Sequence, residues 1–343
     1  MTILPYKIIV ALAQGSVVDI PSNLFSQVYK VAKEGKLLSL LCNYIENVPE
    51  EFRLYLEKRC LLTEFYSEYL RIIAEELSSE GLEYYIFKTV KSFAYDITDL
   101  DLLFIDRKEM LSASKLLIER HKFKPISKGT YSISLRKTVK SLDVDLDLQT
   151  KIAAGIFEYI VISDIKKRLG GEIGYMKNGL NLLCPELELG VIVGHAFYKD
   201  FQISLANILH STYLLRTINK AVVKVIFANY PYLIRPIKML SLLTNLLQMT
   251  LHNNENSLTR KHHGSTEYAP LIKSFYKSIT NYNGHFNIPL ILSMDVYRET
   301  IYMLVKRRQY SQLKEIARLP QSRGISQVLR RIKVLPPEEP FRV

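Results

Sequence analysis

Apolar side chains recur every three or four positions through the first eighty or so residues, the spacing that places them on one face of a helix. One such run extends from Leu24 to Leu38 and a second from Phe65 to Leu77, with a proline break at Pro49 between them. At the start of the chain the uninterrupted apolar run after Lys7 extends only from Ile8 to Ala13, which is too short for a secretory leader, so we expect the opening residues to form a first helix. Residues 1–80 are therefore predicted to be an N-terminal helical segment.

From residue 82 the pattern changes to alternation, which is typical of half-buried strands. The clearest case is Leu142-Asp-Val-Asp-Leu-Asp-Leu148, and Arg107–His121 interrupts the strands with helical spacing. Strands are also expected at 83–87, 99–105 and 131–135, and Asn178-Gly179 predicts a hairpin between 172–176 and 180–183. The fold class expected is α+β, with a small mixed β-sheet domain over residues 81–184 flanked by N-terminal and C-terminal helical regions.

Helical spacing returns at Pro185 and predicts a C-terminal helical domain over residues 185–335 with a tail at 336–343. After a helix from Pro185 towards Tyr198, further helices are expected at about 203–227, 233–252, 268–281 and 289–310. The stretch 253–264 is polar and is expected to be a solvated loop.

Composition is that of a globular protein: 48% of the 343 residues are hydrophobic and 23% are charged, which excludes intrinsic disorder. No apolar run is long enough for a membrane span. Cys42, Cys60 and Cys184 lie far apart, so we expect neither a disulfide scaffold nor a cysteine zinc site, and a reducing cytoplasm fits best. The net charge of +12 indicates an anionic partner.

Acidic residues in this basic chain are the main candidates for chemistry. Asp99 and Asp101 stand two positions apart on an expected strand, so their carboxylates leave the same face. Asp143, Asp145 and Asp147 repeat that geometry, and only one or two of them can reach the same ion. Carboxylates grouped in this way suit divalent ions, and two Mg²⁺ or Mn²⁺ ions could serve phosphoryl transfer. The alternative is a solvated polar face of two amphipathic strands.

Basic and hydroxyl residues follow the first expected strand and are candidates for nucleotide binding. Lys88, Thr89, Lys91 and Ser92 would surround the N-terminus of a short helix ending near Tyr95, where free backbone N–H groups suit phosphate. Arg136 ends another strand of the same sheet and could also contact a triphosphate. The alternative is a helix capped by Thr89 with exposed lysines around it.

The segment Ile86-Phe-Lys-Thr89, the strand Asp99-Leu-Asp101 and the third acidic strand Asp143–Asp147 together resemble the nucleotidyltransferase superfamily of DNA polymerase beta. More narrowly, the chain is similar to the uncharacterised nucleotidyltransferase family of bacteria and archaea, including the helix start at Pro185-Glu186 ahead of His195. The resemblance covers roughly residues 82–215.

This resemblance implies transfer of a nucleoside monophosphate from an NTP to an acceptor hydroxyl, with Mg²⁺ and release of pyrophosphate. The resemblance implies that Asp99 and Asp101 are metal ligands and that Asp145 is the third carboxylate. Asp143 is the next candidate for that third position, and Asp147 is also a candidate. Thr89 stands where the family has glycine, which leaves open a degenerate, non-catalytic nucleotide- or RNA-binding protein.

A third alternative is a toxin component that modifies tRNA. Residues 301–343 carry ten Lys and Arg against three acidic residues, and are the expected docking place for RNA or another anionic acceptor. His195 is expected to be a core histidine, or else a nucleotide contact. The oligomeric state is left open.

Overall fold

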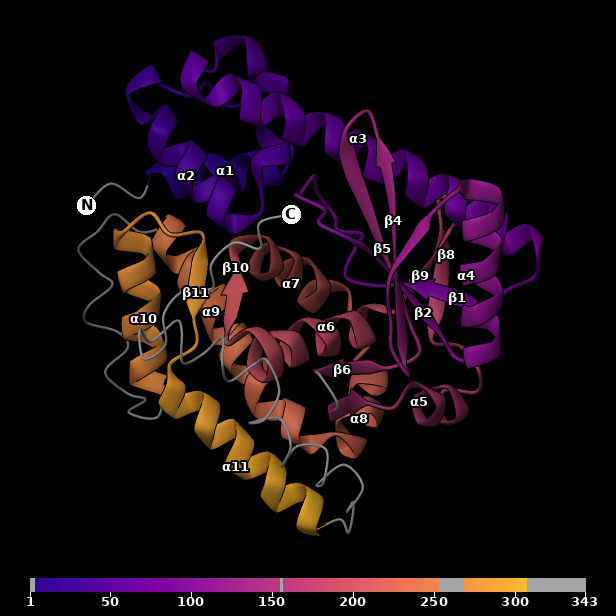
Figure 1. Ribbon diagram of the computed structural model, residues 1–343. Coiled ribbons are helices and arrows are strands. Elements are labelled where there is room, and N and C mark those ends of the chain that lie inside the picture. Colours follow the sequence, from indigo (N-terminus) through magenta and orange to yellow (C-terminus); the bar gives the residue numbers. More distant parts are fainter. Residues whose placement is uncertain (1–3, 155–156, 253–267, 307–343) are drawn as a thin grey trace.

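The computed structural model describes residues 4–154, 157–252 and 268–306 and confirms a mixed α+β fold (Figure 1). The polar 253–264 stretch and most of the basic C-terminal region, from residue 307 onward, lie outside the described residues. Within the described parts, no helix is both long enough and apolar enough to cross a membrane.

The N-terminal segment is helical, as the periodicity predicts. Its elements are α1 (Leu4–Ala13), η1 (Ser22–Leu24), α2 (Phe25–Gly35), η2 (Leu38–Asn47) and α3 (Glu50–Ser79). Helix α3 begins directly after Pro49, whose fixed φ suits the residue preceding a first turn. The long α3 leaves the N-terminal helices and runs along the sheet, so it joins the two parts of the molecule (Figure 1).

A disulfide bond between Cys42 and Cys60 ties η2 to α3, while Cys184 is free. The expectation that the cysteines lie too far apart for a disulfide is wrong for this pair. η2 packs against α3, so two residues 18 positions apart in the sequence meet. The expectation of a cytoplasm rests on unpaired cysteines. Disulfides are rare in a reducing cytoplasm, so this bond removes that reason.

The central sheet has seven strands in the order β3-β4-β5-β2-β1-β9-β8. Strand β2 pairs with β5 in parallel, β1 pairs with β9 in parallel, and the other neighbours are antiparallel. The elements are β1 (Tyr84–Ile86), β2 (Leu100–Phe104), α4 (Arg107–His121), β3 (Lys124–Lys128), β4 (Ser132–Val139), β5 (Leu142–Gln149), β8 (Gly174–Lys177) and β9 (Leu180–Leu183).

The expected strands and the Asn178-Gly179 hairpin are confirmed, and both turn residues have positive φ. Strand β3 was not predicted, because all five of its side chains are exposed at the sheet edge and show no apolar alternation. A two-stranded sheet of β6 (Ile152–Ala154) and β7 (Phe157–Ile160), followed by α5 (Ile162–Arg168), was also missed.

Helices follow β9 as expected, with one correction. The helix expected over 203–227 is two helices, because the backbone becomes extended at Ile218. Asn219 then caps the second helix, its side chain accepting a hydrogen bond from Ala221 N at 2.9 Å. The elements are α6 (Pro185–Gly194), η3 (His195–Asp200), β10 (Gln202–Ser204), α7 (Leu205–Thr217), α8 (Lys220–Asn229), η4 (Pro231–Leu233), α9 (Ile234–His252), α10 (Ala269–Thr280), β11 (His285–Asn287) and α11 (Leu290–Lys306).

The N-terminal and C-terminal helical regions are packed against each other. The Tyr6 hydroxyl lies 2.6 Å from the Asn283 carbonyl oxygen, and a Cβ on Gly284 would lie 2.0 Å from the Gly35 backbone nitrogen. The buried apolar side chains, from Tyr6 to Leu304, form one continuous cluster. The sheet therefore has α3 and α4 packed against it and shares a core with the C-terminal helices (Figure 1).

Candidate functional site

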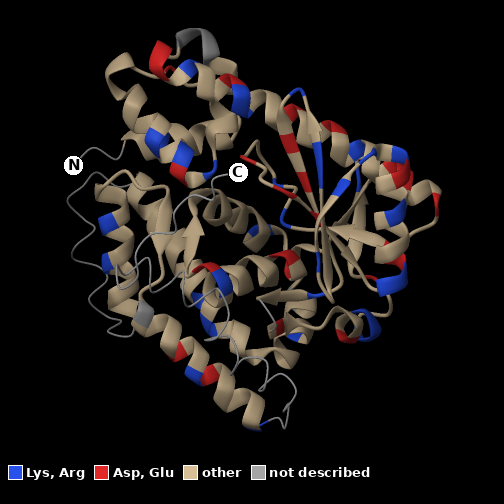
Figure 2. Cartoon of the chain, viewed as in Figure 1, with Lys and Arg blue, Asp and Glu red and all other residues tan. Residues whose placement is uncertain are grey.

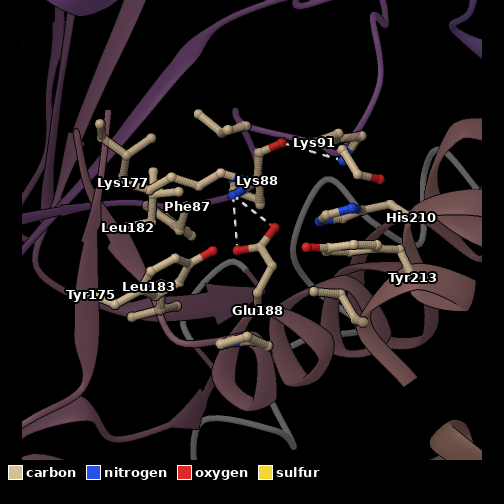
Figure 3. Close-up of a pocket in the computed structure, with 15 residues that line it drawn as sticks. Phe87, Lys88, Lys91, Tyr175, Lys177, Leu182, Leu183, Glu188, His210 and Tyr213 are labelled. Carbon is tan, nitrogen blue, oxygen red and sulfur yellow. Dashed lines mark hydrogen bonds between the residues drawn. The ribbon is translucent and has the colours of Figure 1, made fainter. Parts of the chain in front are cut away.

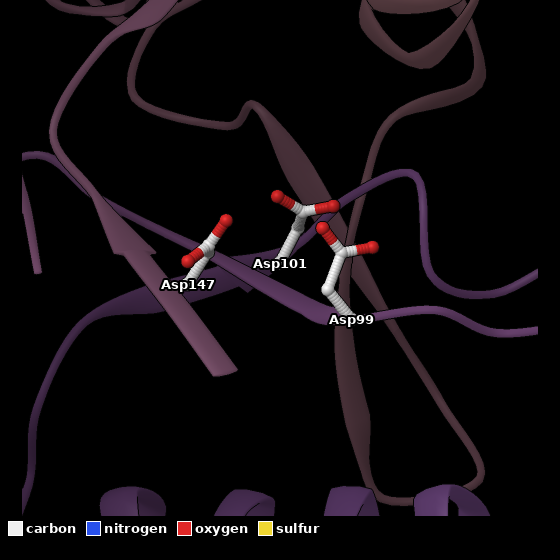
Figure 4. Close-up of side chains that lie close together, drawn as sticks. All are labelled: Asp99, Asp101 and Asp147. Carbon is white, nitrogen blue, oxygen red and sulfur yellow. The ribbon is translucent and has the colours of Figure 1, made fainter. Parts of the chain in front are cut away.

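Three of the candidate aspartates meet where β2 and β5 run side by side. The parallel register places Asp101 opposite Asp147, and Asp99 stands just before β2. Each of the three contributes a carboxylate oxygen, and these oxygens all lie within 4.8 Å of one another (Figure 4). We call Asp99, Asp101 and Asp147 the carboxylate triad. Oxygen ligands converging in this way are the donor set that hard divalent cations take, so the residues present fit Mg²⁺ or Mn²⁺.

Asp145, expected to be the third carboxylate, is engaged elsewhere. The antiparallel β4–β5 register places Arg136 opposite it, and its two oxygens accept hydrogen bonds from Arg136 Nε at 2.6 Å and Nη2 at 2.9 Å. Asp143 lies 3.2 Å from the same guanidinium. The expectation is corrected accordingly: Asp147 lies with Asp99 and Asp101, while Asp143 and Asp145 pair with the arginine expected to bind triphosphate. Figure 2 shows basic positions on β4 beside acidic positions on β5.

Asp101 is the buried member of the triad, with 3% of its surface exposed. Its Oδ1 lies 2.8 Å from Lys88 Nζ and accepts a hydrogen bond from Gln149 Nε2 at 2.7 Å. Burial raises the pKa of Asp101 to about 7; Lys88 opposes that rise, and the charges of Asp99 and Asp147 add to it. The ion pair also raises the pKa of Lys88, although burial acts against this. A lysine thus compensates part of the negative charge that a metal ion would otherwise balance.

The segment after β1 is an irregular turn. The prediction of a short helix there, whose N-terminus would bind phosphate, is therefore wrong. Lys88 adopts a left-handed φ of 59°, which breaks the helical path. Its N–H donates to the Glu188 carboxylate at 3.0 Å, and the Thr89 N–H donates to the Phe87 carbonyl at 2.7 Å. These backbone donors are therefore already used inside the protein.

Thr89 has a structural role in this turn. It is 2% exposed, and its hydroxyl accepts a hydrogen bond from Asp101 N at 2.9 Å while lying 3.2 Å from the Phe87 carbonyl oxygen. The left-handed residue is Lys88 rather than Thr89, so the turn needs no glycine at position 89. Thr89 thus fixes the start of β2 relative to the turn and is a positioning residue for the triad.

A cavity of about 260 Å³ opens beside Asp99 and Asp101. Four lysines line it from separate elements: Lys36 after α2, Lys88 and Lys91 in the turn, and Lys199 in η3. Burial lowers the pKa of Lys91 to about 8, with neighbouring cations acting in the same direction. Carboxylates beside several lysines suit a divalent cation together with a polyphosphate.

His195 also lines this cavity and is half-buried. Its ring lies edge-on to Tyr159 with the centroids 6.2 Å apart. Burial and the nearby lysines hold the pKa of His195 well below its usual value, so the ring is neutral. His195 therefore lies at the cavity wall, and its contact with a nucleotide stays a prediction.

Sequence reasoning missed Gln149, Glu188, Lys36 and Lys199. Gln149 continues the alternation of β5 one step beyond Asp147, so the pattern itself points to it. The others come from helical regions whose approach to the sheet is set by tertiary packing, and their local sequence carries no signal. Ser92 is exposed and lines a neighbouring pocket instead of this cavity.

Comparisons of this chain with protein-family models, with curated proteins and with solved structures found no match.

Proposed function

We propose that this chain is a Mg²⁺-dependent nucleotidyltransferase, which moves a nucleoside monophosphate from an NTP to an acceptor hydroxyl and releases pyrophosphate. The observation that carries the proposal is the carboxylate triad on two parallel strands next to a lysine-lined cavity. A metal–triphosphate substrate requires carboxylates to hold the metal and basic side chains to neutralise the phosphates. The acidic strands and the lysine-lined cavity place both kinds of group next to each other.

In this proposal each residue has a task that its position supports. Asp99, Asp101 and Asp147 hold the divalent ions, which supply charge neutralisation at the triphosphate and activate the acceptor hydroxyl. Lys36, Lys91 and Lys199 line the cavity and would bind phosphate oxygens. Lys88, which pairs with Asp101, would be a fourth cation for the nucleotide once Asp101 held a metal ion. Gln149 orients the Asp101 carboxylate through its hydrogen bond.

A second candidate function is nucleotide binding without turnover. The observation that favours it is the short contact between Lys88 Nζ and Asp101 Oδ1, because a protein cation already satisfies one of the expected metal ligands. The backbone donors of the turn are likewise occupied. Both functions use the same cavity and differ in whether a metal displaces Lys88.

Incubation with each radiolabelled NTP, with Mg²⁺ or Mn²⁺ and with RNA or protein acceptors separates these functions. The wild type should transfer label, and Asp147→Asn should lower the rate by at least about a hundredfold, as expected for loss of a metal ligand. Asp145→Asn is the matched control on the same strand and should keep transfer within a few-fold. Equal transfer by wild type and an Asp99→Ala/Asp101→Ala variant would end the catalytic assignment, whereas NTP binding without pyrophosphate release would favour the second function.

A further inference from the structure

A cavity of about 280 Å³ lies at the junction between the N-terminal segment and the C-terminal helices, lined by α1, α7 and α9 (Figure 1). None of its described lining residues belongs to the sheet, to the turn after β1 or to the carboxylate triad. A space of this size between helices stands out, because protein interiors are close-packed. The carboxylate chemistry described above makes no use of it.

Helix α7 separates this cavity from the site described above. The first turn of α7 lines the cavity beside the triad. His210 and Tyr213, further along the helix, lie beside the turn that follows β1 (Figure 3). Leu209, Thr212 and Arg216 recur at helical spacing on another face of α7 and line the cavity shared with α1 and α9. The cavity is therefore a separate space, reached from a different side of the same helix.

The walls of the cavity are mainly apolar. Val10 and Leu247 are buried beneath it, and Leu209 and Leu251 are half-buried at its surface. An apolar cavity of about 150 Å³ holds one benzene molecule. On that scale, about 280 Å³ has room for roughly ten heavy atoms. The ligand that fits is therefore a small molecule with an apolar body.

Two cations stand among these apolar walls. Lys7 on α1 is half-buried, Arg216 on α7 is exposed, and none of the described lining residues is acidic. Neither cation forms an ion pair with another described residue. Lysine and arginine bind carboxylates through charge-assisted hydrogen bonds, which are stronger than those between neutral groups. The charge of the cavity therefore complements an anionic group on the ligand.

Other occupants fit this combination less well. A nucleotide would place several phosphate oxygens against apolar walls, and an ammonium compound would be repelled by Lys7 and Arg216. A neutral hydrocarbon would leave the two cations without a counter-charge. The segment 253–267, which follows α9, has only one large apolar residue, Leu258, and so does not match the walls.

We propose that this cavity binds a small aliphatic monocarboxylate, with its chain against Val10, Leu209 and Leu247 and its carboxylate at Lys7 and Arg216. The cavity has room for a chain of about the length of octanoate. The inference does not rest on the proposed function, because no residue of the triad or of the lysine-lined cavity takes part.

Isothermal titration of the full chain with octanoate tests the proposal, with octanol and octylammonium as ligands of matched length. The wild type should bind one octanoate per chain, at least roughly tenfold more tightly than octanol, because a hydrogen bond to a charged partner contributes about that much. Octylammonium should bind no more tightly than octanol, since the cavity already holds two cations.

Two variants separate the charge from the apolar walls. Lys7→Met keeps an apolar stem and removes the charge, so it should weaken octanoate at least roughly fivefold and leave octanol within about twofold of wild type. A merely structural role of Lys7 would weaken both ligands alike. Ala11→Phe places a ring in the cavity from α1 and should abolish binding of both ligands.

The matched control is Lys224→Met, which removes an exposed lysine on α8, a helix that does not line the cavity in the described part of the chain. It should bind octanoate within about twofold of wild type. Octanoate should raise the melting temperature of the wild type and of Lys224→Met, but not that of Ala11→Phe. Melting without ligand verifies that each variant is folded.

The proposal is overturned if octanoate does not bind the wild type, or if octanol or octylammonium binds as tightly. It is also overturned if Lys7→Met and Ala11→Phe bind octanoate as Lys224→Met does. The outcome is separable from that of the proposed function, because Asp99→Asn/Asp101→Asn should abolish transfer and bind octanoate as the wild type does. A wild type that binds octanoate but transfers no label would refute the transferase and retain this site.

Discussion

The raised pKa of Asp101 makes metal binding depend on pH in a range where an ordinary aspartate would not. A divalent cation needs the ionised carboxylate, so metal binding must displace the proton that Asp101 carries below its pKa of about 7. An aspartate with its usual pKa is fully ionised across this range and would give no pH dependence. The change from about pH 6 to about pH 7.5 therefore alters the ionisation of Asp101 most, with a smaller change at Lys91.

The magnitude follows from the ionised fraction. With a pKa near 7, roughly a tenth of Asp101 is ionised near pH 6 and roughly three quarters near pH 7.5, so the apparent affinity for Mn²⁺ should rise about eightfold. Binding should release about 0.9 proton near pH 6 and about 0.25 near pH 7.5. Lys91, with a pKa of about 8, is almost fully charged near pH 6 and still roughly three quarters charged near pH 7.5. His195 is neutral because its pKa lies well below its usual value.

Isothermal titration with Mn²⁺, in pairs of buffers with different ionisation enthalpies, measures the affinity and the released protons together. Asp145→Asn should show the same pH dependence as wild type, because Asp145 pairs with Arg136 outside the triad. An affinity that is equal at the two pH values, with no proton release, would refute the reasoning, since it would mean that Asp101 is ionised throughout.

Three further predictions concern the packing that holds the site. Asp96→Ala should lower the free energy of unfolding in urea by about 2–4 kcal/mol, because Asp96 accepts hydrogen bonds from Leu38 N and from both Ser39 N and Oγ at the cavity wall; a loss below about 0.5 kcal/mol would contradict this. Gly284→Ala should lower the free energy of unfolding by at least about 3 kcal/mol, because the added Cβ would clash with backbone atoms of Gly35. Gly81→Ala is the control and should lower it by about 1 kcal/mol, because its added Cβ has no atom within 4 Å. Equal losses in the two variants would refute the close approach of Gly284 to Gly35. Cys42→Ser/Cys60→Ser should lower stability by about 3 kcal/mol relative to the oxidised protein, the expected value for a loop of this length, and mass spectrometry of the wild type should find the bond; unmodified thiols at both positions in the folded protein would contradict the pairing.

Local pattern was sufficient for much of the fold. The alternation in Leu142–Leu148 and the spacing in Arg107–His121 are properties of single elements, and the structure confirms both as a strand and a helix. Asp99 and Asp101 share a face for the same reason, because strand geometry with a period of two needs no tertiary information. These signals are local and can be read directly from the sequence.

The rest depends on register and packing between distant segments. Asp147, rather than Asp145, joins the triad because β2 pairs with β5 in parallel with Asp101 opposite Asp147, a register that the strand sequence alone does not fix. Arg136 and Asp145 then meet across β4 and β5. The turn at Lys88 was expected to be helical because nothing local indicates that Glu188, a hundred residues away, accepts its N–H. Glu188 reaches the turn only because α6 packs beside it.

We propose that Asp99, Asp101 and Asp147 form a divalent cation site where β2 and β5 pair. Anomalous diffraction from a crystal of the protein soaked in Mn²⁺ at pH 7.5 or above tests it most directly, because the signal locates the metal without reference to activity. We expect an anomalous peak between these three carboxylates, with Lys88 Nζ displaced from Asp101. A featureless map at the triad, or a peak at Asp143 and Asp145 instead, would contradict it.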